Sequence, residues 1–98
     1  GGGLADNLKR IIPNKLCANI DLKKIKPLKI FKWLKEKNVL ESEMIKTFNC
    51  GVGFCLIIDS KYFEKVKKCF PYKYKPYIIG EVSSGPKKIR LNAKINWT

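Results

Sequence analysis

Between residues 47 and 53, every second position is a polar residue or a glycine. This segment is the part of the chain best suited to bind a ligand. Thr47 offers a hydroxyl and Asn49 an amide, while Gly51 and Gly53 leave the backbone bare. Because glycine has no side chain, a ligand or another segment can approach the backbone closely at those two positions. We therefore predict that these four residues orient a polar ligand. For Asn49, a left-handed residue at the end of a helix is an equally good interpretation.

A second glycine-rich segment opens the chain. Gly1, Gly2 and Gly3 precede a stretch with helical spacing of apolar residues. The first N–H groups of a helix are unpaired and carry a partial positive charge, so a helix start of this kind can bind phosphate. The alternative is a frayed chain end that binds nothing.

The sequence contains no histidine, and this limits the chemistry that the chain can carry out. A histidine base is excluded, and the serines have no recognisable base partner. Glu41 and Glu43 fall at the start of a predicted helix, where carboxylates usually face water and favour the helix dipole. We therefore predict no catalytic residue in this chain.

Four cysteines, Cys17, Cys50, Cys55 and Cys69, show no Cys-x-x-Cys spacing. The lack of Cys-x-x-Cys spacing and the absence of histidine both argue against a metal site, and none is predicted. A disulfide framework remains possible from the count alone, although Cys50 and Cys55 would point to opposite faces of a strand. Because we find no signal peptide and no membrane-length apolar segment, we expect reduced thiols, a cytoplasmic protein and no membrane contact.

The chain is strongly basic, with 21 Lys and Arg against 8 Asp and Glu and a net charge of +13. Such a charge is typical of nucleic-acid-binding proteins. However, the lysines are scattered, and a composition rich in lysine, isoleucine and asparagine is also what an AT-rich genome produces. Segment 51–57 distantly resembles an RNA-recognition motif, but Cys50 stands at the basic position and Val52 at the first aromatic position. A small basic nucleic-acid-binding module is therefore the alternative function, against which these two residues argue.

The 98 residues suffice for one small domain, whose elements must position these groups. Apolar spacing and turn residues predict four helices and four strands. In chain order these are a helix at 4–12, a strand at 16–20, helices that begin near Pro27 and Glu41, a strand at 51–58, a helix capped by Asp59 and ended by Pro71, and strands at 77–82 and 89–97. This order predicts an α+β fold with helices packed on a mostly antiparallel sheet, which has 51–58 at its centre and 89–97 at an edge.

One longer pattern runs through nearly the whole chain. It consists of Gly1-Gly2-Gly3-Leu4 with Asn7 and Arg10, Pro13, Ala18, Ile20-Asp21, Ile30-Phe31-x-Trp33-Leu34, Asn38-Val39, Glu43-Met44-x-Lys46-Thr47-Phe48-Asn49-Cys50-Gly51-Val52-Gly53, Ile79-Gly80-Glu81-Val82 and Gly85. In order and spacing it resembles the C-terminal part of aminoimidazole ribonucleotide synthetase, the phosphoribosylformylglycinamidine cyclo-ligase. The run from Met44 to Gly53 is the specific part of the resemblance. Lys46 and Phe54 stand where arginine and methionine are usual.

The resemblance implies an enzyme of purine synthesis that closes an imidazole ring at the expense of ATP. In that family an amide oxygen of formylglycinamidine ribonucleotide is activated and a nitrogen then attacks. The resemblance further implies ATP and Mg as cofactors of the full-length enzyme, and a homodimer formed by an N-terminal ATP-binding domain. For this chain it implies substrate- or phosphate-binding roles at Gly1, Gly2, Gly3, Asn7, Thr47, Asn49, Gly51 and Gly53.

We expect residues 1–98 to form a single partial domain, because the resemblance covers only the later part of the C-terminal domain and the N-terminal ATP-binding domain is absent. The chain alone is then expected to bind neither ATP nor Mg and to be inactive. Its expected partner is the remainder of the cyclo-ligase chain, and an engineered fragment and a split-gene product fit equally well. Because a sheet without its first strands has an unpaired edge, the chain should dimerise, exchange elements or bind the N-terminal portion.

Overall fold

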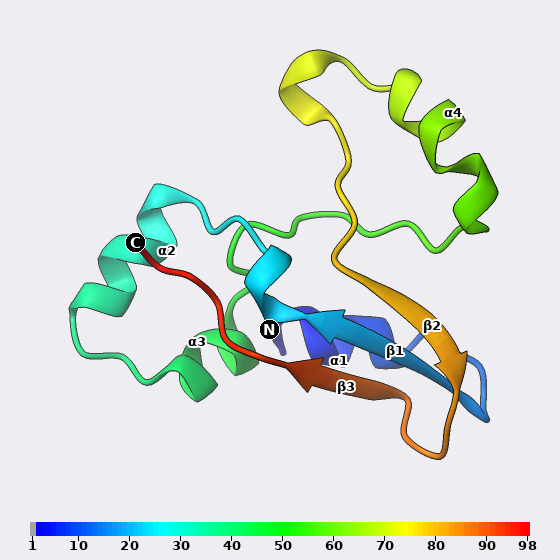
Figure 1. Cartoon of the computed structure of the whole chain (residues 1–98). Helices are drawn as coiled ribbons and strands as arrows, with labels where there is room; N and C mark the ends of the chain where they lie inside the picture. Colours follow the sequence, from blue (N-terminus) through cyan, green and yellow to red (C-terminus); the bar gives the residue numbers. More distant parts are fainter. Residues whose placement is uncertain (1) are drawn as a thin grey trace.

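The computed structural model describes residues 2–98, and Gly1 lies outside the described residues. The helices are α1 (Gly3–Lys9), α2 (Lys29–Glu36), α3 (Glu41–Thr47) and α4 (Phe63–Lys68), and the strands are β1 (Leu16–Asp21), β2 (Gly80–Ser84) and β3 (Ile89–Asn92). Short 3₁₀ turns occupy Leu22–Lys24, Ser60–Tyr62 and Tyr72–Tyr74. Figure 1 shows one small sheet with α1 across one face, α2 and α3 beside one end and α4 apart, so the predicted α+β class is confirmed. Across residues 2–98, every helix is too short or too polar to cross a lipid bilayer.

The three strands form one sheet in the order β2-β1-β3. β2 pairs antiparallel with β1, and β3 pairs parallel with the other edge of β1. The sheet is therefore mixed rather than mostly antiparallel. The reason is the short connection after β2, which passes the end of β1, where the Gly85 N–H donates to the Lys15 carbonyl at 3.0 Å. β3 is an edge strand, as predicted.

The predicted central strand at 51–58 is wrong. These residues follow an irregular path and pair with no strand among residues 2–98. The centre of the sheet is β1, whose Cys17, Ala18 and Ile20 are buried, whereas Phe54 is 82% exposed. An apolar sequence favours a strand, but a strand also needs a neighbour to satisfy its backbone N–H and C=O groups.

The other predicted elements differ from the structure mainly at their ends. β2 begins at Gly80 rather than Tyr77 and continues to Ser84, which the sequence assigned to a turn. β3 ends at Asn92 rather than Trp97, because Ala93 takes a left-handed conformation with φ of 63°. Three of the four helices lie within the predicted segments, and α1 begins one residue earlier, at Gly3, and ends at Lys9 rather than Ile12. The agreement is close because apolar spacing and helix-end signals are local properties of the sequence.

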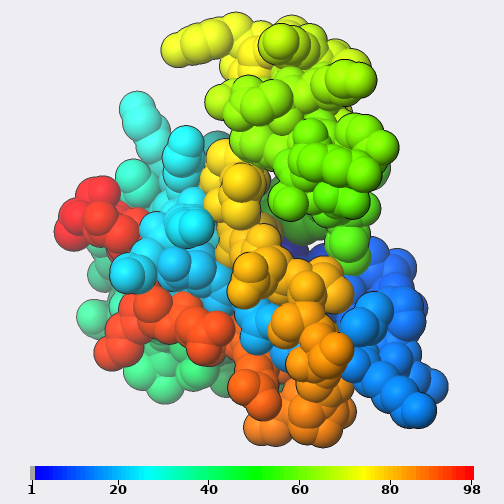
Figure 2. Space-filling model, turned by 45° about the vertical axis from the view of Figure 1, so that its right-hand side comes forward, coloured from blue at the N-terminus to red at the C-terminus, as the bar shows by residue number. Residues whose placement is uncertain are grey.

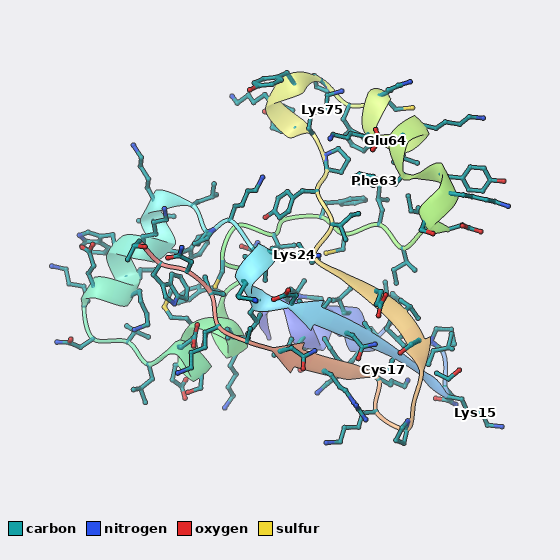
Figure 3. All side chains as sticks on the ribbon, viewed as in Figure 1. Lys15, Cys17, Lys24, Phe63, Glu64 and Lys75 are labelled. Carbon is teal, nitrogen blue, oxygen red and sulfur yellow. The ribbon has the colours of Figure 1, made fainter. Side chains whose placement is uncertain are left out.

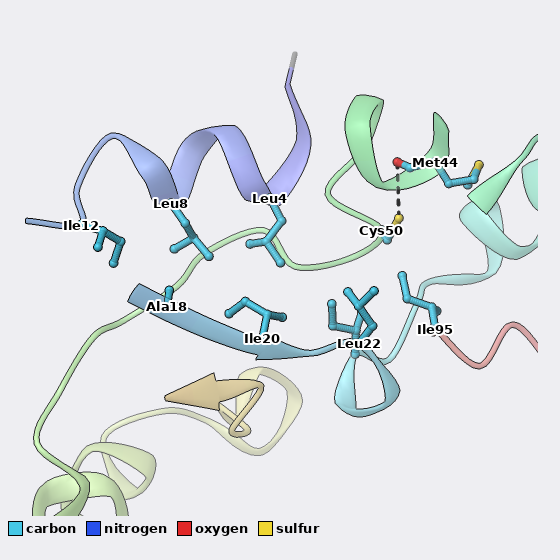
Figure 4. Packing of buried hydrophobic residues seen from close by; sticks show 10 residues of the cluster. Leu4, Leu8, Ile12, Ala18, Ile20, Leu22, Met44, Cys50 and Ile95 are labelled. Atoms are coloured by element: carbon cyan, nitrogen blue, oxygen red, sulfur yellow. Dashed lines mark hydrogen bonds between the residues drawn. The ribbon is translucent and has the colours of Figure 1, made fainter. Parts of the chain in front are cut away.

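The hydrophobic core lies between β1 and the helices α1 and α3 (Figure 4). Leu4 and Leu8 of α1 face Ala18 and Ile20 of β1, and Met44 of α3 is completely buried. Burying apolar side chains of this size stabilises a fold by about 1.5–3 kcal/mol each. Because α1 and α3 share this core, the start of α1 is brought against the end of α3.

Residues 59–75, which we call the α4 unit, stand apart from the sheet (Figures 1 and 2). The unit begins as predicted, with the Asp59 carboxylate accepting a hydrogen bond from the Lys61 N–H at 3.1 Å. Its hydrogen bonds are internal; for example, the Lys75 ammonium donates to the Lys67 carbonyl at 3.0 Å. The α4 unit is therefore held mainly by its own contacts.

Candidate functional site

A pocket of about 260 Å³ lies where the start of α1 meets the end of α3. Four predicted binding residues line it, namely Gly3, Asn7, Thr47 and Asn49. The remaining lining residues are Phe31 and Phe48. The packing of α1 on α3 thus brings two sequence segments about 40 positions apart to one site.

Gly3 makes the close contact between the two helices possible. It is buried, and its φ of +64° lies in the left-handed region that favours glycine. A Cβ atom at this position would overlap the carbonyl oxygen of Ile45 and lie 3.1 Å from the carbonyl oxygen of Phe48. The bare backbone predicted at Gly3 therefore receives another backbone segment, and the pocket opens beside that contact.

Asn7 is fixed at the wall of the pocket by two hydrogen bonds. Its Nδ2 donates to the Gly3 carbonyl at 2.7 Å, and its Oδ1 accepts from Arg10 Nη1 at 3.3 Å. The second bond holds a guanidinium, a permanent positive charge, beside a pocket residue. Arg10 was not among the residues predicted to bind a ligand. Its i+3 spacing from Asn7 on a predicted helix was the available signal.

Asn49 shapes the turn that follows α3. Its Oδ1 accepts a hydrogen bond from the Gly51 N–H at 2.9 Å, which is a turn that asparagine side chains commonly make. The left-handed residue is Cys50, with φ of 54°, so the interpretation of Asn49 as a left-handed helix end is wrong. Among residues 2–98, no group accepts a hydrogen bond from Asn49 Nδ2 or from the Thr47 hydroxyl. Both groups can therefore donate to a ligand.

Phe31 and Phe48 form an aromatic wall of the pocket. Their ring centroids lie 5.8 Å apart, with the planes tilted by 51°, and both side chains pack partly buried against the core. Both residues therefore contribute to the core and to the pocket. The position of Phe48 between Thr47 and Asn49 was the signal for its second role.

The remaining predicted residues lie elsewhere. Gly1 is outside the described residues, and Gly2 lines a separate hollow of about 500 Å³. Gly51 has φ of +102°, and a Cβ there would lie 3.1 Å from the Leu28 backbone nitrogen, so a chain segment rather than a ligand approaches it. Nothing lies within 4 Å of a Cβ built on Gly53. Binding roles at these four glycines remain predictions.

The thiol nearest the site is Cys50, which is buried behind the turn. Its Sγ lies 3.8 Å from the Met44 carbonyl oxygen. Burial, and secondarily the negative charge of Glu41, raises the pKa of this thiol above its usual value of 9.0. The thiol therefore stays protonated at neutral pH and is a poor nucleophile. The described residues 2–98 include no group of three His, Cys, Asp or Glu side chains that could hold a metal ion.

Comparison with known proteins gives the relatives of this chain. Residues 1–91 match the family described as AIR synthase related protein, C-terminal domain. The chain is 43% identical over 94 residues to phosphoribosylformylglycinamidine cyclo-ligase of Carboxydothermus hydrogenoformans. This aligned stretch covers 94% of this chain and 27% of that protein. It is 36% identical over 84 residues to trifunctional purine biosynthetic protein adenosine-3 of Homo sapiens, covering 84% of this chain and 8% of that protein. No solved structure matches the chain.

This chain therefore spans about a quarter or less of the length of these two curated relatives. The match extends over the segments that form α1, α3 and the pocket between them. On this evidence the chain belongs to the family of AIR synthase related proteins and matches that family's C-terminal domain.

Proposed function

We propose that this chain serves as a C-terminal part of an ATP-dependent cyclo-ligase, which converts formylglycinamidine ribonucleotide into aminoimidazole ribonucleotide. The proposal is supported by the identity of 43% to a protein named as that cyclo-ligase. The observation that carries it is the pocket, because Gly3, Asn7, Thr47 and Asn49 meet there from two separate segments.

In this proposal the pocket orients the polar part of the nucleotide substrate. The Thr47 hydroxyl and the Asn49 amide donate hydrogen bonds, and the Arg10 guanidinium adds positive charge at the edge beside Asn7. Hydrogen bonds from such groups to a charged acceptor contribute about 1.5–3 kcal/mol each. Phe31 and Phe48 provide an apolar wall that limits the orientations of the ligand. These residues bind and orient, and no proton transfer is assigned to them.

The ATP and Mg of the proposed enzyme are assigned to the longer protein. Because residues 2–98 offer no cluster of metal-binding side chains, the fit of Mg to this part of the chain is poor, and we derive no reaction step through it. We further propose that the chain is a partial domain, that its partner is the rest of the cyclo-ligase chain, that the complete enzyme is a cytoplasmic homodimer, and that residues 1–98 alone do not turn over substrate.

The alternative, a nucleic-acid-binding module, is not favoured. Figure 3 shows Lys15, Lys24 and Lys75 far apart, at the tip of the sheet, beside the end of β1 and in the α4 unit. A nucleic-acid site usually gathers its positive charge on one face. Six of the lysines do lie together in residues 59–75, but the others are spread over the rest of the chain. The family match over residues 1–91 favours the cyclo-ligase over the nucleic-acid-binding module.

The test is a chimera in which residues 1–98 replace the matching stretch of the Carboxydothermus enzyme. Its ATP-dependent turnover of formylglycinamidine ribonucleotide is measured for the unmodified chimera and for two variants. Asn49→Asp keeps the Oδ1 acceptor for the Gly51 N–H but loses the Nδ2 donors and adds a negative charge. Asn96→Asp is the matched control, because Asn96 Oδ1 likewise accepts from an N–H two residues later, that of Thr98 at 3.1 Å, far from the pocket in sequence.

We expect the unmodified chimera to be active and Asn49→Asp to raise KM. Loss of one hydrogen bond to a charged group, at about 1.5–3 kcal/mol, corresponds to a rise of about 10- to 150-fold. Asn96→Asp should change KM less than about twofold, because an exposed substitution outside the site costs little. A folded chimera without turnover would contradict the proposed function. Equal KM values for the two variants would remove the pocket from the substrate site.

A further inference from the structure

The strongest unexplained feature of the surface is the segment 53–58, which we call the open segment. Four of its six residues are large, apolar and exposed: Phe54 at 82%, Leu56 at 48%, Ile57 at 50% and Ile58 at 40%. A small monomeric protein rarely exposes consecutive apolar side chains in this way, and such patches usually mark an interaction site. The open segment therefore needs a physical account that the pocket does not provide.

The backbone of the open segment is unpaired as well. Within residues 2–98, none of its N–H or C=O groups takes part in a hydrogen bond; the last bonded group before it is the Val52 N–H, which donates to the Asn49 carbonyl at 3.0 Å. An extended segment with free N–H and C=O groups is a template for pairing with another strand. Because adjacent residues of a strand point to opposite faces, Leu56, Ile57 and Ile58 together would make both faces apolar. This pattern is typical of a strand buried inside a sheet.

The charge of the molecule indicates what kind of strand can pair there. The open segment is uncharged, but the α4 unit that follows it carries lysines at positions 61, 65, 67, 68, 73 and 75 against Asp59 and Glu64. Two copies paired along this segment would bring two such units together, in a chain whose net charge is already +13. Like charges disfavour that arrangement, so self-pairing is the poorer choice.

We propose that the open segment is the docking site for one β-strand from polypeptide outside these 98 residues, and that it becomes a strand only when that partner pairs with it. The inference rests on the proposed function, because the longer relatives supply the polypeptide: about three quarters of the Carboxydothermus enzyme lies outside the match. The partner strand is uncharged and apolar on both faces, and its backbone provides most of the binding, as in other cases where a peptide adds a strand to an open edge.

The first experiment compares hydrogen exchange in the 98-residue chain with exchange in the chimera described above. Amides 54–58 should exchange as in an unstructured peptide in the chain alone, and at least about a hundredfold more slowly in the chimera. Fast exchange of these amides in a folded chimera would overturn the proposal. Slow exchange in the chain alone would also overturn the proposal. Sedimentation would then show whether the chain is a monomer, with the segment paired internally, or a dimer, with the segment paired to a second copy.

The second experiment needs no folded chimera. The 98-residue chain is expressed together with the His-tagged remainder of the Carboxydothermus enzyme, and its copurification is measured for the unmodified chain, Ile57→Lys and Ile11→Lys. Ile57 is 50% and Ile11 59% solvent-exposed, so either substitution should leave the stability of the chain alone unchanged. We expect retention of the unmodified chain and of Ile11→Lys, and at least about tenfold less of Ile57→Lys, because a buried lysine is costly. Equal retention of all three, or no retention of the unmodified chain, would overturn the proposal.

The two proposals fail separately. A chimera that turns over substrate while amides 54–58 exchange rapidly supports the proposed function and refutes the docking site. A chimera that protects those amides but shows no turnover supports the docking site and refutes the proposed function.

Discussion

Replacement of Gly3 by alanine tests the contact that forms the pocket. The φ of Gly3 is +64°, and its missing Cβ would overlap the Ile45 carbonyl oxygen. Alanine therefore meets two separate obstacles, one in its own backbone conformation and one in the neighbouring helix. Because the obstructing atom belongs to the backbone of α3, no side-chain rotation can relieve the overlap, and α1 must move away from α3.

The expected loss of stability can be worked out from these two obstacles. A left-handed conformation costs an L-residue about 1–2 kcal/mol. An added methyl group in a packed contact costs about 1–3 kcal/mol. The sum, about 2–5 kcal/mol, is a large part of the roughly 5–15 kcal/mol that stabilises a natural domain. For a domain of this size each kcal/mol lowers Tm by about 4–8 °C, so a decrease of at least about 8 °C is expected.

The assay is urea unfolding of the 98-residue chain, followed by the fluorescence of its two tryptophans. Gly53→Ala is the control, because Gly53 has no positive φ and a Cβ there meets nothing within 4 Å. It should leave the free energy of unfolding unchanged or raise it by up to about 1 kcal/mol, through the reduced freedom of the unfolded chain. If Gly3→Ala and Gly53→Ala unfold at the same urea concentration, the packing of α1 against α3 described here is incorrect.

Three further predictions concern the thiols and the charge. In the folded chain, Ellman's reagent should label the exposed Cys69 first and the buried Cys17 and Cys50 only at the rate of unfolding, which mass spectrometry of quenched samples can follow. Burial raises the pKa of Cys50 and Cys55 above 9.0, so the unfolded chain loses these protons first and the free energy of unfolding falls as pH rises above about 9. Urea unfolding at pH 7.5 and at pH 10 should show this fall, and the fall should be smaller in Cys50→Ala. A free energy of unfolding that increases with pH would contradict the assignment. Binding to single-stranded RNA should be weak and should fall at least about tenfold between 50 and 200 mM salt, as measured by filter binding, whereas a sequence-selective complex at physiological salt would favour the alternative function.

The helices and their ends could be predicted because their signals are local. Asp59 caps its 3₁₀ turn, and α1 ends before Pro13, in both cases through residues only a few positions away. The strand at 51–58 could not be predicted correctly, because its sequence is suited to a strand but its pairing depends on a distant segment. β1 shows the opposite case: a short run, Leu16 to Ile20, becomes the centre of the sheet because it pairs with residues of two strands that lie 60 or more positions later.

The pocket was predictable in its polar residues and not in its shape. Thr47 and Asn49 could be selected by chemistry, and Asn7 by the family resemblance, but only packing brings them together. The glycines illustrate what sequence cannot separate, since the same residue type serves a helix contact at Gly3, a turn at Gly51 and open solvent at Gly53. Glycine indicates where a backbone can be approached, whereas the fold decides what approaches it.

The pairing of β1 also determines when the sheet can form during synthesis. Asp21 of β1 pairs with Asn92 of β3, so about 70 residues must be made after β1 before its last neighbour exists. A ribosome that adds about 5–20 residues per second needs about 4–14 s for that stretch. During the first part of this time, before α3 is made, the apolar side chains of β1 have only α1 to cover them. Closing so long a loop then makes the pairing with β3 slow. The nascent chain is therefore expected to depend on chaperones until Ile89 to Asn92 has left the ribosome.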